Sequence, residues 1–201
     1  MGHSRVRLQE MTLADFPSVH AYASLPACAT YQALGPNTEE ETYAYIQQVV
    51  EEATYEPRSR FVYVICEGTT SVHGIGAVEL QIKDPIQAVG EMGYIIHPHY
   101  WGRGYATEAA AQLLQIGYSF LRLQRIYATC HPGNKASSSV LEKLGFHYEA
   151  LLPNHIKRMD GTCSSFLYSL LKEEWQALRG REKDLGFNAS SVLSHLLELE
   201  S

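Results

Sequence analysis

The sequence lacks the features that would mark a membrane, metal or nucleic-acid protein. No apolar run is long enough to cross a bilayer, and the polar residues 1–5 do not resemble a signal peptide. The 4 cysteines include no Cys-x-x-Cys pair, so neither a zinc site nor a disulfide framework is expected. A net charge of −6 disfavours nucleic-acid binding and is compatible with a cationic amine substrate. We therefore expect a cytoplasmic protein with reduced, mostly buried thiols and no metal.

The length and composition predict one domain with a short extension. With 201 residues, 45% of them hydrophobic, and no repeat or low-complexity linker, the chain can bury one core. Residues 1–175 are predicted to form this domain, and residues 176–201 a C-terminal helical extension. A short helix beginning near Ser190 should pack on the same domain through an apolar stripe, which consists of Val192, Leu193, Leu196 and Leu197.

Hydrophobic periodicity predicts an α/β protein whose sheet has mixed direction. The strands are expected over residues 5–10, 61–67, 73–83, 88–97, 125–130 and 166–171, with a hairpin turn at 158–161. Helices are expected to start at Thr12 and after Thr38, to span 105–121, and to run from Asn134 to residue 144. The three strands between 61 and 97 should form an antiparallel meander. A crossover helix then makes strand 125–130 parallel to strand 88–97.

The most informative segment is His99-Tyr-Trp-Gly-Arg-Gly104, which joins a predicted strand to a predicted helix. The first N–H groups of a helix have no intrahelical acceptor and carry partial positive charge, so a pyrophosphate can bind there. Gly102 and Gly104 allow the backbone to approach such a group. The segment is not a dinucleotide fingerprint, because Thr107 stands at the third small position, and it lacks the Gly-Lys-Ser/Thr of a P-loop. An ordinary glycine turn that leads into a core helix is the alternative.

At these residues the chain resembles the GNAT superfamily of acetyl-CoA-dependent N-acyltransferases, whose phosphate loop reads Gln/Arg-x-x-Gly-x-Gly/Ala. His99 departs from the first position of that pattern. The string from Glu91 to Ala109 resembles the branch of ribosomal-protein N-terminal (RimJ/RimL-like) acetyltransferases, and so does the block from Asn134 to Phe146. Two motifs in the family's order are more specific than either one alone.

The resemblance implies a GNAT-like fold, which is a mixed, mostly antiparallel twisted sheet flanked by helices, with one splayed parallel strand pair. It implies that the pantetheine arm of acetyl-CoA enters the splay and bonds to amides of the first strand. It also implies that Asn134 contacts pantetheine in addition to capping its helix. The cofactor-binding residues expected on this basis are Tyr94, Ile95, Ile96, His97, Gly102, Arg103, Gly104, Tyr105, Ala106, Thr107, Asn134 and Ser137.

The implied reaction transfers acetyl directly from acetyl-CoA to a primary amine. An α-amino group with a pKa of about 8 is mostly protonated at neutral pH, so a carboxylate is needed to collect its proton. Glu91, in the family's Glu-x-Gly-Tyr string, is the first candidate, and Glu79 is the second. The alternative for Glu91 is an exposed edge position. Many family members place a tyrosine acid four residues after the position of Ser137, where this chain has Leu141, so Ser137 is expected to hydrogen-bond the leaving sulfur.

Other features leave alternatives open. Histidines near strand ends can assist proton removal near neutral pH, and these are His97, His99, His131, His147 and His155. Related sequences place an Asp where Ser164 stands, so any substrate contact of that Asp cannot be transferred. The acceptor is either a protein N-terminus or a small-molecule amine, and the protein is a monomer or a homodimer. The alternative function is a CoA-binding sensor or interaction module that has lost turnover.

Overall fold

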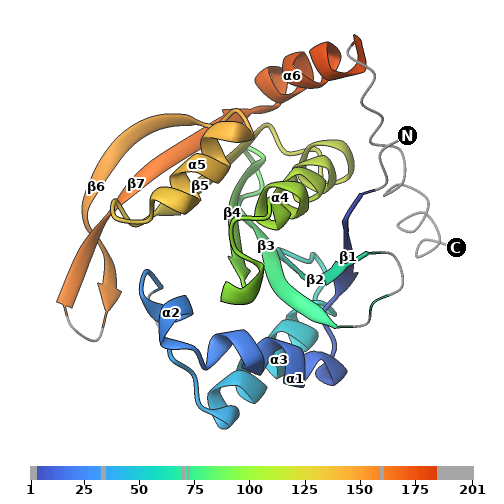
Figure 1. Ribbon diagram of the computed structural model, residues 1–201. Coiled ribbons are helices and arrows are strands. Elements are labelled where there is room, and N and C mark those ends of the chain that lie inside the picture. Colours follow the sequence, from blue (N-terminus) through green and yellow to red (C-terminus); the bar gives the residue numbers. More distant parts are fainter. Residues whose placement is uncertain (1–3, 33–34, 69–70, 72, 159–160, 185–201) are drawn as a thin grey trace, which may run out of the picture.

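The computed structural model describes residues 4–32, 35–68, 71, 73–158 and 161–184 (Figure 1). At its centre lies a sheet of 7 strands in the order β1-β2-β3-β4-β5-β7-β6. All neighbouring strands are antiparallel except β4 and β5, which are parallel. This confirms the predicted mixed sheet and the meander of β2, β3 and β4. The strands are β1 (Val6–Glu10), β2 (Arg60–Glu67), β3 (Gly74–Asp84), β4 (Val89–Ile96), β5 (Arg125–Cys130), β6 (His147–Arg158) and β7 (Gly161–Leu171).

Helices cover both faces of this sheet. Successive residues of a strand point to opposite faces. In β2, Val62 and Val64 pack in one apolar cluster with residues of α1 and α3, whereas Tyr63 and Ile65 pack in a second cluster with residues of α4. The helices are α1 (Phe16–Ala23), α2 (Pro26–Ala29), α3 (Glu39–Glu52), α4 (Tyr105–Gln115), α5 (Lys135–Lys143) and α6 (Lys172–Asp184). Helices α4 and α5 therefore share the face opposite α1 and α3.

Capping residues start the early helices where the sequence predicts. Thr12 donates its backbone N–H to the carboxylate of Asp15 at 2.8 Å, and a single 3-10 turn, Leu13–Asp15, leads into α1. At α3, the hydroxyl of Thr38 accepts from the N–H of Glu41 at 3.2 Å, and the Glu41 carboxylate accepts from the N–H of Thr38 at 2.8 Å. Such reciprocal bonds satisfy N–H groups that have no partner within the helix.

Two predicted elements differ from the structure in detail. The predicted helix over 105–121 is α-helical only to Gln115 and continues as a π-helical turn over Ile116–Phe120. The predicted strand over 166–171 is the end of a longer strand that begins at Gly161, because it pairs with β6 on one side and β5 on the other. Sequence patterning missed the first half of β7, where alternation is weak.

The boundary predicted at residue 175 falls within α6, which runs from Lys172 to Asp184. The ring of Trp175 lies 5.0 Å from that of Tyr118, so the start of this helix is anchored on the domain. The predicted helix near Ser190 lies outside the described residues. Within the described ranges, no helix has both the length and the apolar composition needed to span a membrane.

Candidate active site

The parallel strands β4 and β5 separate soon after they meet. They pair only from Val89 and Arg125 to Glu91 and Tyr127, while β5 remains paired with β7 along its full length. Beyond Glu91 the side of β4 that faces β5 therefore lacks a neighbouring strand. Backbone groups on such an edge need other partners, and an amide-bearing ligand can supply them. The predicted splay is thus present.

Alternate residues of β4 turn their backbone groups toward this gap. The N–H of His97 donates to Ile75 O at 2.8 Å, on the β3 side. Neighbouring residues of a strand point their backbone groups in opposite directions, so those of Tyr94 and Ile96 face the gap. Ile96 O already accepts from Trp101 Nε1 at 2.6 Å. Of the four strand residues predicted to bind cofactor, Ile95 and His97 thus direct their amides toward β3.

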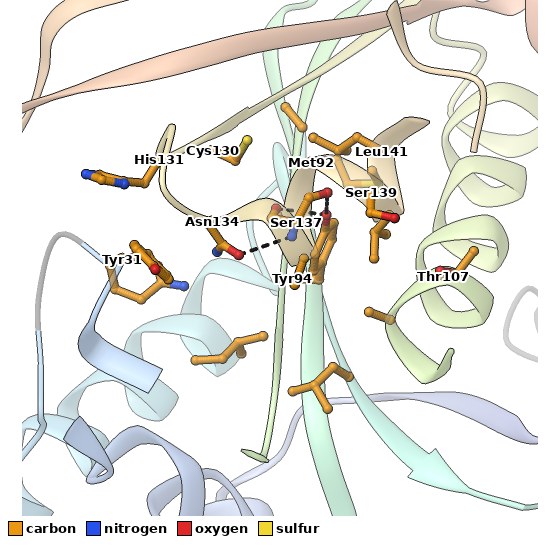
Figure 2. Close-up of a pocket in the computed structure, with 18 of the residues that line it drawn as sticks. Tyr31, Met92, Tyr94, Thr107, Cys130, His131, Asn134, Ser137, Ser139 and Leu141 are labelled. Carbon is orange, nitrogen blue, oxygen red and sulfur yellow. Dashed lines mark hydrogen bonds between the residues drawn. The ribbon is translucent and has the colours of Figure 1, made fainter. Parts of the chain in front are cut away.

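A cavity of about 800 Å³ follows the gap (Figure 2). This volume lies within the range of small-molecule sites. Most of the predicted site residues line it, namely Glu91, Tyr94, Ile95, Ile96, Gly102, Gly104, Tyr105, Ala106, Thr107, Asn134 and Ser137. His97 and Arg103 do not line it. The guanidinium of Arg103 instead lies 5.6 Å from the centre of the Tyr100 ring.

At one end of the cavity, helix α4 begins with free amides. Gly104 is its N-cap with φ of 84°, and Gly102 has φ of 72°. Both values lie in the left-handed region that favours glycine. The N–H of Glu108 makes the first intrahelical bond, to Gly104 O at 3.1 Å. The preceding N–H groups therefore have no intrahelical acceptor and form an anion-binding end.

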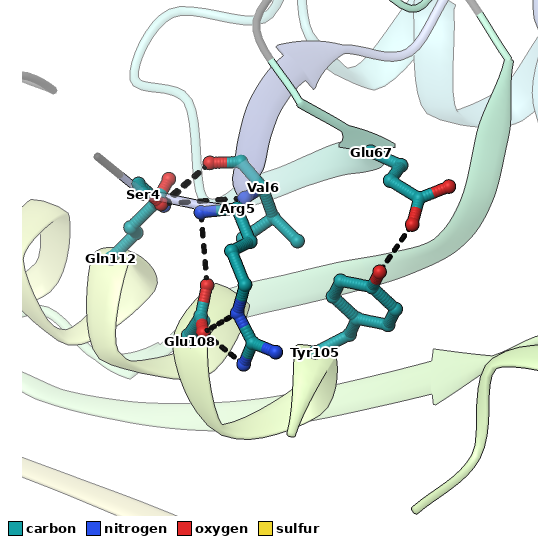
Figure 3. A network of polar contacts seen from close by, with 7 residues as sticks. All are labelled: Ser4, Arg5, Val6, Glu67, Tyr105, Glu108 and Gln112. Atoms are coloured by element: carbon teal, nitrogen blue, oxygen red, sulfur yellow. Dashed lines mark hydrogen bonds and ion pairs between the residues drawn. The ribbon is translucent and has the colours of Figure 1, made fainter. Parts of the chain in front are cut away.

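A cation from the start of the chain lies beside this anion-binding end (Figure 3). Arg5 donates through Nε to a carboxylate oxygen of Glu108 at 2.6 Å. Its guanidinium lies 5.3 Å from the centre of the Tyr105 ring and 3.1 Å from the position that a Cβ would take on Gly104. The sequence does not predict this contact, because 103 positions separate Arg5 from Glu108.

On the opposite side of the gap, Asn134 and Ser137 begin α5. Asn134 is the N-cap, and its Oδ1 accepts from the N–H of Ser137 at 3.1 Å, which confirms the predicted capping role. The hydroxyl of Tyr94 on β4 lies 3.0 Å from both the carbonyl oxygen and the Oγ of Ser137 (Figure 2). Burial raises the pKa of Tyr94 well above its usual range, so this hydroxyl stays protonated. The side chain of Tyr94 therefore connects the two sides of the gap.

The two candidate carboxylates both line the cavity, but they have different partners. Arg60 donates to both oxygens of Glu79, at 2.8 and 3.0 Å. Glu91 lies 3.1 Å from Lys83 Nζ, and the hydroxyl of Tyr127 donates to it at 3.4 Å. A bidentate guanidinium occupies the lone pairs of its partner, whereas a single ammonium leaves one oxygen free. Glu91 is therefore better placed than Glu79 to accept a proton.

Among the described residues that line the cavity, one of the five candidate histidines is present, and it is His131. Its ring lies 5.2 Å from that of Tyr31, which follows α2, so the two rings meet at the cavity. Sequence patterning predicted neither helix α2 nor the contact between Tyr31 and His131. The Pro26 at the first position of α2 is a start signal for a helix, but a helix of only 4 residues has no periodicity to detect.

Two thiols also line the cavity, and both are suited to packing. Cys28 and Cys130 are both buried, as predicted for most of the cysteines. Burial raises the pKa of each thiol. Since the thiolate is the reactive form, both are poor nucleophiles near neutral pH. Among the residues that the structure describes, no group of at least three His, Cys, Asp or Glu side chains could hold a metal ion.

Comparison with known proteins agrees with this geometry. The acetyltransferase (GNAT) domain family matches residues 5–147. The chain belongs to this family, and this match together with its N-acetyltransferase relatives supports an acetyl-CoA-dependent acyltransferase.

Several relatives cover most of the chain. It is 34% identical over 170 residues to the uncharacterized N-acetyltransferase YoaA of Bacillus subtilis, covering 84% of this chain and 94% of the relative. It is 26% identical to spermidine N(1)-acetyltransferase of Escherichia coli, with coverage of 75% and 77%. A GNAT-family acetyltransferase structure from Bacillus anthracis superposes with a TM-score of 0.74 at 26% identity, covering 87% of this chain and 99% of that one.

The predicted branch is also represented. RimJ of Mycobacterium smegmatis, solved in complex with CoA-disulfide, shares the fold with a TM-score of 0.74 at 20% identity, covering 84% of this chain and 83% of that one. This likeness confirms the fold, and the family match confirms the predicted resemblance to GNAT acetyltransferases.

Proposed function

We propose that this protein binds acetyl-CoA along the β4–β5 gap and transfers the acetyl group directly to a primary amine bound in the same cavity. One observation carries the proposal. The gap exposes unpaired backbone groups of β4, and it leads to the free amides at the start of α4. An arm with amide groups that ends in a pyrophosphate complements both features. The structure of Mycobacterium smegmatis RimJ in complex with CoA-disulfide supports the same choice of cofactor.

The residues lining the cavity favour direct transfer over a covalent enzyme intermediate. A two-step mechanism needs an activated nucleophile, and the thiols at the cavity, Cys28 and Cys130, have raised pKa values because they are buried. In the direct mechanism, amides between Gly102 and Thr107 bind the pyrophosphate. Glu91 accepts the proton of the amine through water, and Ser137 donates a hydrogen bond to the leaving sulfur.

The acceptor is a primary amine, either on a protein N-terminus or on a small molecule. One relative is named for spermidine. Residues of α2, β4 and α5 line the cavity. The family motifs include the residues of β4 and α5 but not those of α2. Cytoplasmic location, the oligomeric state and the fit of the pantetheine to Asn134 remain predictions.

The first test replaces Gly104, where α4 begins. We expect Gly104→Glu to weaken acetyl-CoA binding by about a hundredfold, because a side chain and a negative charge enter the space of the pyrophosphate. Gly104→Ala is the matched control, since it carries the same strained backbone angle without the charge. Calorimetric titration of both variants with acetyl-CoA measures the difference. If folded Gly104→Glu binds acetyl-CoA as tightly as Gly104→Ala and the wild type do, the phosphate site lies elsewhere.

Steady-state kinetics test the reaction itself. Initial rates at varied acetyl-CoA and amine concentrations should give intersecting reciprocal plots, whereas parallel plots indicate a covalent intermediate. Mass spectrometry of an acceptor panel of peptides and small amines identifies the acetylated product. A protein that binds acetyl-CoA tightly but acetylates no member of the panel, and only hydrolyses acetyl-CoA slowly, fits a sensor instead.

A further inference from the structure

The environment of Ser137 differs from that of an isolated hydroxyl group. Its Oγ lies 3.0 Å from the hydroxyl of Tyr94, and the same phenol lies 3.0 Å from the carbonyl oxygen of Ser137. A carbonyl oxygen only accepts hydrogen bonds, whereas each hydroxyl has a single hydrogen to donate. The phenol therefore has two alternative acceptors on the same residue, and it can change between them without moving its ring.

Each choice of acceptor has a different consequence for Ser137. When Tyr94 donates to the carbonyl, the Ser137 hydroxyl can donate back to the phenol oxygen, and its single hydrogen is then engaged by Tyr94. When Tyr94 donates to Oγ, the hydrogen of Ser137 is free to point into the cavity. A hydroxyl that accepts one hydrogen bond becomes a stronger donor of the next, because bonds in such a chain polarise one another.

We infer that Tyr94 is a positioning residue whose hydroxyl orients that of Ser137, so that Ser137 donates a hydrogen bond to the sulfur of the departing CoA. This inference rests on the proposed function. It also explains how the site can lack a tyrosine on α5. At that position many family members have a tyrosine, whereas this chain has Leu141, which is fully buried. The phenol beside the cavity comes from β4 instead of α5.

During the proposed acetyl transfer, neither Tyr94 nor Ser137 loses its hydroxyl proton. The amine nitrogen forms a bond to the acetyl carbon, and the carbon–sulfur bond breaks with its electron pair passing to sulfur. The proton of the amine passes toward Glu91, and CoA leaves as a thiolate. Ser137 donates to that thiolate while it accepts from Tyr94. Burial raises the pKa of Tyr94, which keeps its hydrogen in place for this role.

A binding measurement separates this role from a purely structural one. If the bound thiolate receives a hydrogen bond, the pKa of the CoA thiol falls in the complex, and CoA affinity rises with pH up to the free thiol pKa of about 8.5. Acetyl-CoA has no titrating thiol, so it is the internal control. We expect the affinity for CoA to rise about tenfold relative to that for acetyl-CoA across this range in the wild type.

The variants for this titration are Tyr94→Phe, Ser137→Ala, the double variant and Tyr168→Phe. We expect Ser137→Ala to abolish the rise, Tyr94→Phe to reduce it to about threefold or less, and the double variant to match Ser137→Ala alone, because Tyr94 acts through Ser137. Tyr168 is the matched control. It is buried, its hydroxyl donates to Glu142 of α5 at 3.3 Å, and it does not line the cavity.

Three results with the variants would overturn the inference. A wild-type rise that persists in Tyr94→Phe, additive losses in the double variant, or the same loss in Tyr168→Phe would each make Tyr94 a structural residue only. A flat CoA to acetyl-CoA ratio in a wild type that binds both ligands contradicts the inference but leaves the proposed cofactor intact. A wild type that binds neither ligand contradicts the proposed function as well.

Discussion

At the scale of single residues, the contacts of Glu91 determine whether it can accept the proton of the amine. Glu91 lines the cavity, and its side chain is 30% exposed beside the ammonium of Lys83. Burial and the nearby carboxylate of Glu91 raise the pKa of Tyr127, so this phenol keeps its proton and donates to Glu91. Both partners contact Oε2 of Glu91, which leaves its other carboxylate oxygen to collect a proton from water or from the amine.

Substitution of this carboxylate should change the pH dependence of turnover. Below the amine pKa of about 8, few acceptor molecules are neutral, and we expect Glu91→Gln to lower kcat/KM for the amine about a hundredfold there. At higher pH the amine is already neutral, so the deficit should shrink. The affinity for acetyl-CoA should stay nearly unchanged. The pH profile of kcat/KM and calorimetric titration with acetyl-CoA measure the two effects.

Glu79→Gln is the control for this experiment, because it removes the other carboxylate at the cavity. Its loss leaves Arg60 with the carboxylate of Glu52, to which Nη1 donates at 2.9 Å. We expect a stability change from that rearrangement without a new pH dependence. If Glu79→Gln shows the pH-dependent deficit and Glu91→Gln does not, Glu79 is the proton acceptor instead of Glu91.

At the scale of elements, the N-terminus of α5 combines a structural and a binding role in one side chain. Asn134 uses its Oδ1 to cap the helix, and the family resemblance assigns it a pantetheine contact as well. Serine is as good a cap as asparagine, whereas alanine loses about 1 kcal/mol of stability. The two roles can therefore be separated by substitution.

We expect Asn134→Ala to lower both stability and acetyl-CoA affinity, and Asn134→Ser to lower affinity alone. The loss of one neutral hydrogen bond to the cofactor corresponds to about a threefold to tenfold weaker binding. Urea unfolding without ligand gives the stability, and calorimetry gives the affinity. Wild-type affinity in the serine variant would show that Asn134 serves the helix alone.

The sequence predicts these elements to different degrees. The run of β-branched and aromatic residues within 61–67 and the capping at Thr38 reveal β2 and α3, because local patterning determines both elements. The glycine loop was found for the same reason, since φ of 84° at Gly104 favours glycine. Arg5 beside the loop and Tyr31 beside His131 were not found, because only the fold brings these residues together.

Tyr94 shows most directly what the sequence alone does not predict. The sequence predicts it as a cofactor contact through its backbone amide, on the basis of a motif. The motif says nothing about its side chain, whose hydroxyl meets Ser137, 43 positions later in the chain. This contact depends on where α5 crosses the end of the gap, and that position is set by tertiary packing.

At the scale of the whole molecule, the overall charge does not describe the cavity. The chain has a net charge of −6. Among the described residues that line the cavity, the carboxylates are Glu79 and Glu91, and the lysines are Lys135 and Lys143. Both carboxylates already have a cationic partner, in Arg60 and Lys83 respectively. The described lining therefore offers no unpaired carboxylate for a second positive charge on the acceptor.

This balance predicts a preference for acceptors with a single amine. An unpaired cation that leaves water for a protein cavity loses solvation without compensation. We expect kcat/KM for a peptide with one amine and neutral side chains to exceed that for spermidine by about tenfold or more. Because no network of exposed charges would hold the peptide, its kcat/KM should also depend weakly on salt. Product formation at low and high ionic strength measures both quantities.

Lys83→Gln tests the same charge argument from the protein side. The substitution removes the ammonium that lies 3.1 Å from Glu91, so the carboxylate becomes available to a second cation. We expect the variant to gain activity toward spermidine relative to the peptide, and the gain should fall as salt screens the new interaction. A wild type that prefers spermidine, with a preference that salt abolishes, would mean that acidic residues outside the described cavity lining recognise the acceptor.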